Sequence, residues 1–309
     1  HYNDLGYDGS TITGVTVAAR NPGSWANNLK VAIIDDLADQ VLQFSTLPSN
    51  IQVGFGITQA IPPNTVVAGS GTTSLLTGYF KGIVTEVDTT LKKVSVKILE
   101  SVTEAGVSTS VDYQPNGIYK FGNTVATIHN NAGVATGTGS PTGNSDWFDQ
   151  QAIQLTNSTI NWNNISDRPG TSNFSSARDS KFDEVHVVVI DDTGEVSGNA
   201  GTILEKHLSL SKAKDGEYSL GSPSYWRKYT YNNSTNIFAG GAPTGIVTTS
   251  FAPGTFNLSS DVGWDQNTQG IRFAGIGATT LTLGGGKNYD GGTDEEATGA
   301  FQVTIAGLA

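Results

Sequence analysis

Hydrophobic and polar residues alternate over many short stretches of the chain, which is the pattern of β-strands. Residues 31–34 are apolar without interruption, as in a strand buried on both faces, and residues 182–191 form a second strongly apolar stretch. A polar turn precedes the first stretch, where Pro22 fixes the backbone φ angle and Gly23 relieves the turn. We therefore expect both stretches as strands of one core unit.

The region between them reads as short strands separated by turns. The expected strands are 52–57, 65–68, 76–88, 92–100, 110–113 and 118–121. Residues 88–91 (Asp-Thr-Thr-Leu) separate two cleanly alternating strands, which predicts a hairpin. Short strands at this spacing indicate a small barrel or sandwich.

Other stretches have different patterns. We expect one helical turn at 37–42, a low-complexity loop at 134–144, a short helix at 203–211 and an aromatic strand at 225–231. The whole pattern predicts a β-rich α+β fold, in which a mixed-sheet core domain carries a long inserted small β-barrel or sandwich domain. The expected boundaries are 11–37 and 178–290 for the core domain and 38–177 for the inserted domain.

Length and composition agree with this organisation. The chain has 309 residues, enough for a core with a large insertion, and it is rich in Gly (38) and poor in charged residues (15%). A formal net charge of −11 and the lack of a basic patch argue against a nucleic-acid partner. Without Cys, neither a disulfide framework nor a thiolate metal site is possible. No apolar run reaches the ~20 residues needed to span a bilayer.

Two polar turns invite a ligand-binding interpretation. Residues 284–288 (Gly-Gly-Gly-Lys-Asn) look like part of a phosphate loop, but the Walker spacing requires Gly and Ser or Thr where the chain has Leu281 and Asn288. Residues 265–270 begin like a calcium loop, but the twelfth position, which requires a bidentate acid, is Ile276. Both stretches are therefore predicted to be plain turns.

The titratable residues do not form a recognisable catalytic pattern. The histidines have no metal-ligand spacing, and His186, placed between two valines, is predicted to be a surface or hydrogen-bonded structural residue. Adjacent acids point to opposite faces of a strand, which applies to the pairs at 35–36, 191–192 and 295–296. The sequence therefore predicts no enzyme activity, no metal site and no cofactor.

The turn before the first apolar strand carries a family resemblance. Residues 22–31 (Pro-Gly-Ser-Trp-Ala-Asn-Asn-Leu-Lys-Val) resemble the Pro-Gly-x-Trp-Gly-Asn-x-Leu-x-Val segment of contractile-tail sheath proteins, with Ala26 in place of the usual Gly. Residues 283–286 (Leu-Gly-Gly-Gly) resemble the Leu-x-Gly-Gly segment that precedes the C-terminal domain of that family. Further similar segments follow in the family's order at 183–191, 204–213, 225–228 and 233–237. Segments that look specifically like the sheaths of T-even-like myophages infecting marine cyanobacteria are 147–151, 168–172 and 263–267.

The resemblance implies a structural virion protein. Sheath subunits form stacked hexameric rings around a rigid tail tube and contract to drive the tube through the host envelope. The implied partners are other sheath subunits, and the tail tube and baseplate through domains absent from this chain. The implied location is the tail of the virion, after assembly in the host cytoplasm. The residues that the resemblance implies to be fold-defining are Pro22, Gly23, Trp25, Asn27, Leu29, Val31, Gly284 and Gly285.

The same resemblance gives the expected domains their roles. The core corresponds to an outer sheath domain, the inserted domain to a protruding domain, and residues 291–309 to the start of the link to an absent C-terminal domain. The chain begins at His1 and contains no Met, so we expect an excerpt of a longer polypeptide.

Two other function classes remain open from the sequence. The chain could be a carbohydrate- or receptor-binding β module, an adhesin, that uses aromatic residues such as Tyr79, Phe80 and Tyr119. A glycan hydrolase with paired acids is the other alternative, although no catalytic motif supports it. A glycan array tests the first alternative and a turnover screen tests the second.

Overall fold

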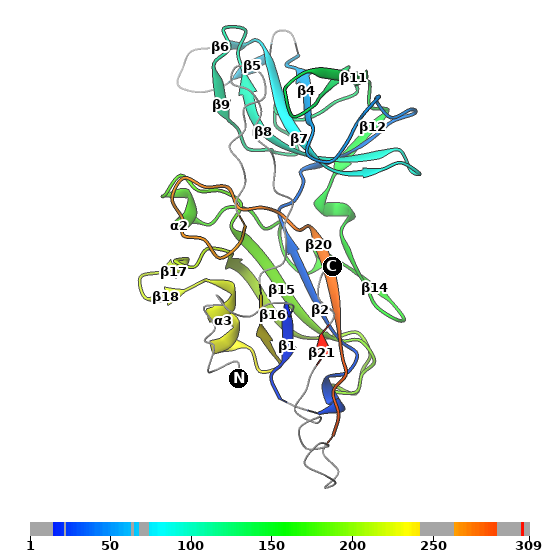
Figure 1. Cartoon of the computed structure of the whole chain (residues 1–309), viewed down its shortest axis with the longest axis vertical. Helices are drawn as coiled ribbons and strands as arrows, with labels where there is room; N and C mark the ends of the chain where they lie inside the picture. Colours follow the sequence, from blue (N-terminus) through cyan, green and yellow to red (C-terminus); the bar gives the residue numbers. More distant parts are fainter. Residues whose placement is uncertain are drawn as a thin grey trace. The chain divides into compact units, whose positions relative to one another are not determined.

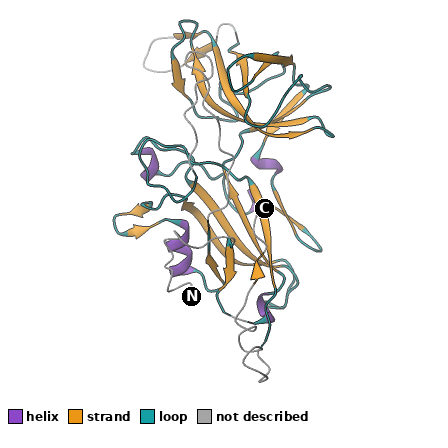
Figure 2. Cartoon of the chain, in the orientation of Figure 1, coloured by secondary structure: helices purple, strands orange, loops and turns teal. Residues whose placement is uncertain are grey.

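The computed structural model describes residues 15–21, 23–62, 65–67, 74–241, 263–288 and 304–305. The chain divides into two compact units. The first unit takes the described residues of His1–Asp36, Gln151–Gly245 and Val262–Ala309, and the second takes those of Leu37–Gln150. Strands dominate both units and the helices are short (Figures 1 and 2). The predicted β-rich α+β fold class is confirmed.

A five-stranded sheet forms the centre of the first unit (Figure 1). In spatial order its strands are β16 (Thr202–Ser211), β15 (Glu184–Asp191), β2 (Leu29–Asp35), β20 (Ala278–Gly284) and β21 (Thr304–Ile305). The central strands β2 and β15 are the two strongly apolar stretches of the sequence, and they pair along the whole length of β2. Every strand pair in this sheet is antiparallel, which differs from the mixed sheet expected from the sequence.

A layer of shorter elements covers one face of this sheet. The layer consists of α3 (Trp226–Asn233), β1 (Val17–Ala19) and β19 (Ile237–Ala239). Val31 and Ile33 of β2 are fully buried and belong to the core beneath it. Trp226 and Trp264 meet edge to face in the same core, with ring centroids 5.3 Å apart. Burial of this apolar area is the main favourable contribution to the stability of the unit.

Two elements of the first unit differ from the sequence expectation. Residues 203–211, predicted as a short helix, form most of β16, because they pair with the buried strand β15 across two register shifts. Residues 225–231, predicted as an aromatic strand, begin α3 instead. Trp226 and Thr230 are both about 1% exposed and lie four residues apart, so the helical period buries them together.

The remaining elements of the first unit are short. They are η1 (Ser24–Ala26), β13 (Ala152–Gln154), β14 (Thr159–Asn161), η3 (Trp162–Asn164), α2 (Asn173–Ser176), β17 (Glu217–Ser219) and β18 (Ser222–Pro223). The sequence assigned residues 151–177 to the inserted domain, but they pack with the first unit. The Lys30 ammonium, for example, donates a hydrogen bond to the Gln154 carbonyl at 2.9 Å.

An eight-stranded antiparallel sheet makes up most of the second unit. The strand order is β11 (Ala135–Gly139), β10 (Ala126–His129), β4 (Gly56–Ala60), β7 (Tyr79–Asp88), β8 (Lys93–Val102), β3 (Gln40–Gln43) and β12 (Gly143–Asp146), with β9 (Ser108–Ser110) paired to β8. A separate two-stranded sheet contains β5 (Thr65–Val67) and β6 (Ser74–Leu76). Within the described residues the end strands β11 and β12 do not pair, so the eight-stranded sheet is not a closed barrel.

Several expectations for the second unit can be compared directly with these strands. The hairpin at 88–91 is confirmed, because β7 and β8 pair there and the Asp88 carboxylate accepts the N–H groups of the two residues at its tip. Residues 40–43 form β3 where a helical turn was predicted, and the expected loop at 134–144 supplies β11 and part of β12. Residues 118–121 form no strand, since the Phe121 N–H donates to the Gln40 side chain at 2.7 Å.

A buried ion pair joins four segments of the first unit. Lys212 Nζ lies 2.7 Å from Asp35 Oδ2, and both side chains are 0% exposed. The ammonium also donates to the carbonyls of Phe182 and Ala274, at 2.9 and 3.1 Å. The carboxylate accepts the backbone N–H groups of residues 276–277. All three ammonium protons and both carboxylate oxygens therefore have partners, which a buried pair requires.

Replacing Asp35 with Asn should lower the free energy of unfolding by about 3–5 kcal/mol, because the buried Lys212 charge loses its counter-charge. Urea unfolding measures this change. The control is Lys214→Met, which replaces an exposed lysine two residues after Lys212. Its free energy of unfolding should stay within about 0.5 kcal/mol of wild type. Equal effects of the two substitutions would contradict the assignment.

Candidate functional site

Two of the segments that resemble sheath proteins meet at one junction in the first unit. The Asn27 side chain forms a pair of hydrogen bonds with Gly286: Nδ2 donates to the carbonyl at 3.0 Å, and Oδ1 accepts the N–H at 2.8 Å. The Asn28 N–H donates to the Leu283 carbonyl at 3.0 Å. Asn27 and Gly286 are 259 positions apart, so the junction is a purely tertiary contact.

The two backbones approach closely at this junction. A Cβ atom on Gly286 would lie 2.1 Å from the Gly23 carbonyl oxygen, a distance that no side chain tolerates. Gly23 has φ of 129°, and a Cβ atom there would lie 2.9 Å from Trp25 Cδ1. The Ser24 N–H completes the contact by donating to Asn288 Oδ1 at 2.9 Å. Both glycines are therefore required by the geometry of the junction.

The other motif residues contribute to the fold around the junction. Leu29 and Val31 are 1% and 0% exposed in the core of the first unit. Trp25 is half-buried and its Nε1–H donates to the Asn21 carbonyl at 3.2 Å. Each of these side chains packs or forms its hydrogen bond within the first unit, so its contribution is structural.

The glycine run has no phosphate-loop geometry. Gly284 is the last residue of β20, and the exposed Gly285 follows with φ of 76°. The next N–H, which a phosphate loop would point at its ligand, is bonded to Asn27. Pro22, the first residue of the resemblance, lies outside the described residues.

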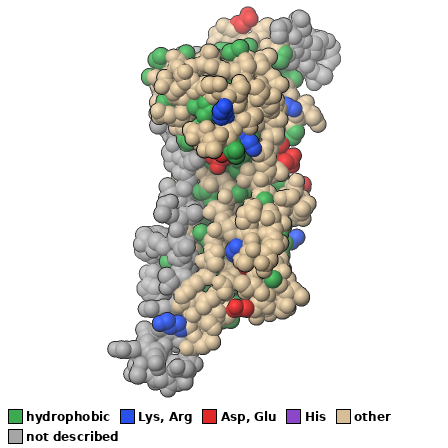
Figure 3. Space-filling model, turned by 90° about the vertical axis from the view of Figure 1, so that its right-hand side faces the viewer, with side chains coloured by type: hydrophobic (Ala, Val, Ile, Leu, Met, Phe, Trp, Pro, Cys, Tyr) green, Lys and Arg blue, Asp and Glu red, His purple; other side chains and the backbone are tan. Residues whose placement is uncertain are grey.

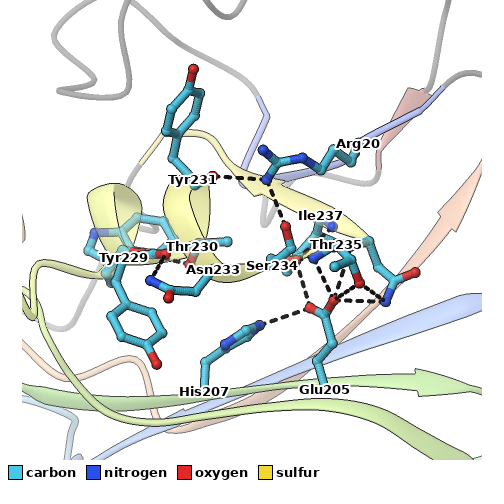
Figure 4. Close-up of polar contacts among 12 residues, drawn as sticks. Arg20, Glu205, His207, Tyr229, Thr230, Tyr231, Asn233, Ser234, Thr235 and Ile237 are labelled. Carbon is cyan, nitrogen blue, oxygen red and sulfur yellow. Dashed lines mark hydrogen bonds and ion pairs between the residues drawn. The ribbon is translucent and has the colours of Figure 1, made fainter.

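A second polar cluster, which the sequence did not reveal, surrounds Glu205 on β16 (Figure 4). Glu205 Oε1 accepts hydrogen bonds from the backbone N–H and side chain of both Thr235 and Asn236, at 2.7–3.0 Å. Its Oε2 accepts the Ser234 hydroxyl at 2.6 Å and lies 2.8 Å from His207 Nε2. One carboxylate therefore fixes the turn between α3 and β19 to the edge of the sheet.

The environment of Glu205 keeps it ionised. Burial opposes ionisation, but hydrogen bonds from His207, Ser234 and Thr235 outweigh it and hold the pKa of Glu205 well below its ordinary value. A carboxylate with so many fixed donors is a poor proton acceptor at neutral pH. The cluster therefore suits a structural role better than acid–base catalysis.

Arg20 holds the same turn from the other side (Figure 4). Its Nη1 donates to the carbonyls of Tyr231 and Ser234, at 2.9 and 2.7 Å, where α3 ends. A cation at this position also interacts favourably with the helix dipole. Its guanidinium carbon lies 4.6 Å from the centre of the Phe238 ring.

The adjacent acids do not converge on a common site. Asp191 accepts hydrogen bonds from the loop that follows it, whereas Asp192 pairs with Lys30 at 3.2 Å. Asp35 belongs to the buried ion pair, and the acids at 295–296 lie outside the described residues. Within the described part of the chain, no group of three His, Asp or Glu residues could hold a metal ion.

His186 is a hydrogen-bonded structural residue, one of the two roles predicted for it. The Ser209 N–H can only donate, so His186 Nδ1, at 2.9 Å, is the acceptor and carries no proton. The Nε2–H therefore donates to the Asp167 carbonyl at 3.0 Å. Ser209 has φ of 50°, and the neutral imidazole supports this unusual backbone of β16.

Of the aromatic residues proposed for sugar binding, Phe80 is buried, and Tyr79 and Tyr119 are partly buried. Phe80 is 0% exposed and packs edge to face on Phe121, with ring centroids 4.7 Å apart. Tyr119 is partly buried against the same core. Phe80 is therefore not available to stack on a ligand.

Comparisons with protein-family models, curated proteins and solved structures found no significant match for this chain. Among the described helices, none is long and apolar enough to cross a membrane. The contacts between Asn27 and Gly286 therefore define the candidate site. It is a structural junction whose polar groups bond to one another.

Replacing Asn27 with Asp tests this junction. The Asp side chain keeps an acceptor for the Gly286 N–H but sets a carboxylate against the Gly286 carbonyl, so we expect the free energy of unfolding to fall by about 1–3 kcal/mol. Urea unfolding provides the measurement. Asn288→Ala removes one exposed hydrogen bond and should cost less than about 1 kcal/mol. A larger loss in this control than in N27D would refute the central role of Asn27.

His186 should make stability depend on pH. Burial is the largest cause that lowers its pKa, whereas an unfolded histidine titrates near about 6.5. The unfolded chain therefore binds more protons below that pH. The stabilising contribution of neutral His186 is present above about pH 6.5 and is lost as the pH falls, by at most about 1.4 kcal/mol per pH unit.

The measurement is urea unfolding of wild type and His186→Gln between pH 7.5 and 5.5. Gln retains one acceptor and one donor but does not titrate, so its stability should change less over this range. His129, whose pKa is also lowered chiefly by burial, contributes to the slope that remains. Identical slopes for the two proteins would exclude His186 as the titrating group.

Proposed function

We propose that this chain is a structural part of a contractile tail sheath, located in the virion tail after assembly in the host cytoplasm. Its partners in this proposal are other sheath subunits in stacked hexameric rings, with the tail tube and baseplate contacted through other domains. Contraction of the rings drives the tube through the host envelope. The chain acts mechanically and carries out no reaction.

The observation that supports the proposal best is the contact between Asn27 and Gly286. These residues belong to two segments that resemble sheath proteins, and they bond to each other across 259 positions. Other similar segments supply β15, β16 and the start of α3, which are elements of the same unit. Most of the segments that carry the resemblance therefore lie in one packed unit.

The chemistry of the described residues also suits a mechanical subunit. The clusters around Glu205 and around the Asp35–Lys212 pair use their polar atoms internally, which favours a fixed shape. On the face shown in Figure 3, charged side chains of both signs are scattered among the described residues. Contraction would then exchange contacts between subunits while each unit keeps its fold.

Expression of the complete open reading frame that contains this sequence tests the proposal. Electron microscopy should show tubes of stacked hexameric rings, because sheath subunits assemble with copies of themselves. Asn27→Asp in the same reading frame should reduce the yield of tubes, and Asn288→Ala should leave it near wild type. A protein that stays monomeric and binds a specific sugar on a glycan array would instead identify an adhesin.

A further inference from the structure

Residues 111–125 connect β9 to β10 in the second unit without forming a strand. They contain a turn at 114–117, closed by a hydrogen bond from the Gly117 N–H to the Gln114 carbonyl at 2.7 Å. Asn116 is exposed at this turn, and among the described residues no hydrogen bond holds its side chain. Asn116 and Gly117 form the only Asn-Gly pair in the sequence.

The glycine leaves the Asn116 amide open to attack by the backbone nitrogen that follows it. Gly117 has no Cβ atom to hinder this nitrogen, and its backbone has the widest choice of conformations. A Cβ atom at this position would lie 3.1 Å from the Gln114 carbonyl oxygen, so another residue would also crowd the turn. The two reacting groups are therefore adjacent in the chain and exposed to water.

The turn has to open before the reaction, because its hydrogen bond occupies the Gly117 N–H. Local opening of an exposed turn outside a sheet costs little free energy. The next part of the connection is anchored separately, since the Phe121 N–H donates to Gln40 at 2.7 Å and the Gly122 N–H donates to Gln59 at 2.7 Å. The turn therefore opens without unfolding of the eight-stranded sheet.

We propose that Asn116 is a site of spontaneous deamidation, with the Gly117 nitrogen as the nucleophile and water as the second reactant. The Gly117 N–H gives its proton to hydroxide, and the nitrogen attacks the Asn116 Cγ atom. The new N–Cγ bond closes a succinimide ring, the Cγ–Nδ2 bond breaks, and ammonia leaves with a proton from water. Water then opens the ring at either carbonyl, which leaves aspartate or isoaspartate.

The product changes the surface of the second unit. It adds one negative charge, and isoaspartate also adds a carbon atom to the backbone of the turn. The Lys120 ammonium donates to the Pro115 carbonyl at 2.9 Å, so the new carboxylate forms next to a cation, which reduces its electrostatic cost. The reaction is irreversible and marks the age of the protein. It does not depend on the proposed sheath function.

Peptide mapping by mass spectrometry tests the site, after incubation of the folded chain at pH 8 and 37 °C in ¹⁸O-labelled water. The peptide that contains Asn116 should convert to aspartate and isoaspartate forms that carry one labelled oxygen. Asn131 is the matched control within the same chain, because it is also exposed in a turn but precedes Ala132. It should react at least ~10-fold more slowly, a difference of about 1.4 kcal/mol in activation free energy.

Gly117→Ala should slow the reaction of Asn116 toward the rate of Asn131. If G117A does not fold, the same substitution in a synthetic peptide of residues 112–120 gives this comparison. An unchanged rate in that peptide would overturn the role of the Gly117 nitrogen. The site itself is rejected if Asn116 in the folded chain is intact when the wild-type peptide has fully converted, or if Asn116 and Asn131 react at equal rates.

Discussion

The buried ion pair between Asp35 and Lys212 is the interaction on which the first unit depends. Its two charges stand at the end of β2 and just after β16, and its other hydrogen bonds reach the backbone near residues 182 and 274–277. These segments must meet at one position for the charges to be compensated. A buried pair adds little net stability over apolar residues, but losing one partner is costly. We therefore infer that the pair mainly selects this arrangement over alternatives.

The same use of polar groups recurs through the first unit. Glu205 fixes the turn after α3, Asn27 joins the ends of β2 and β20, and neutral His186 supports the irregular backbone at Ser209. Each group has partners within its own unit, so it contributes shape and offers no free nucleophile or base. The buried Arg227 guanidinium likewise pairs with a carboxylate of the same unit, Asp265, at 3.6 Å.

Local patterns identified some elements and misassigned others. The apolar runs of β2 and β15 and the hairpin at 88–91 were predictable, since burial on both faces and turn chemistry act over a few residues. Residues 203–211 contain apolar positions that fit both a helix and a strand, and pairing with β15 decided for the strand. The candidate site was predictable only in part. Asn27 and the glycines carried a resemblance, whereas no local signal marked Glu205 as a centre of hydrogen bonds.

The sequence by itself determined the β-rich class, the two most buried strands and the absence of cysteine chemistry, because composition and short periodicities report local preference and burial. Only the tertiary structure decided that Asn27 bonds to Gly286, that Asp35 pairs with Lys212, and that Arg227 pairs with Asp265. These contacts join residues far apart along the chain. Their geometry arises from the packing of whole strands, and no local pattern encodes it.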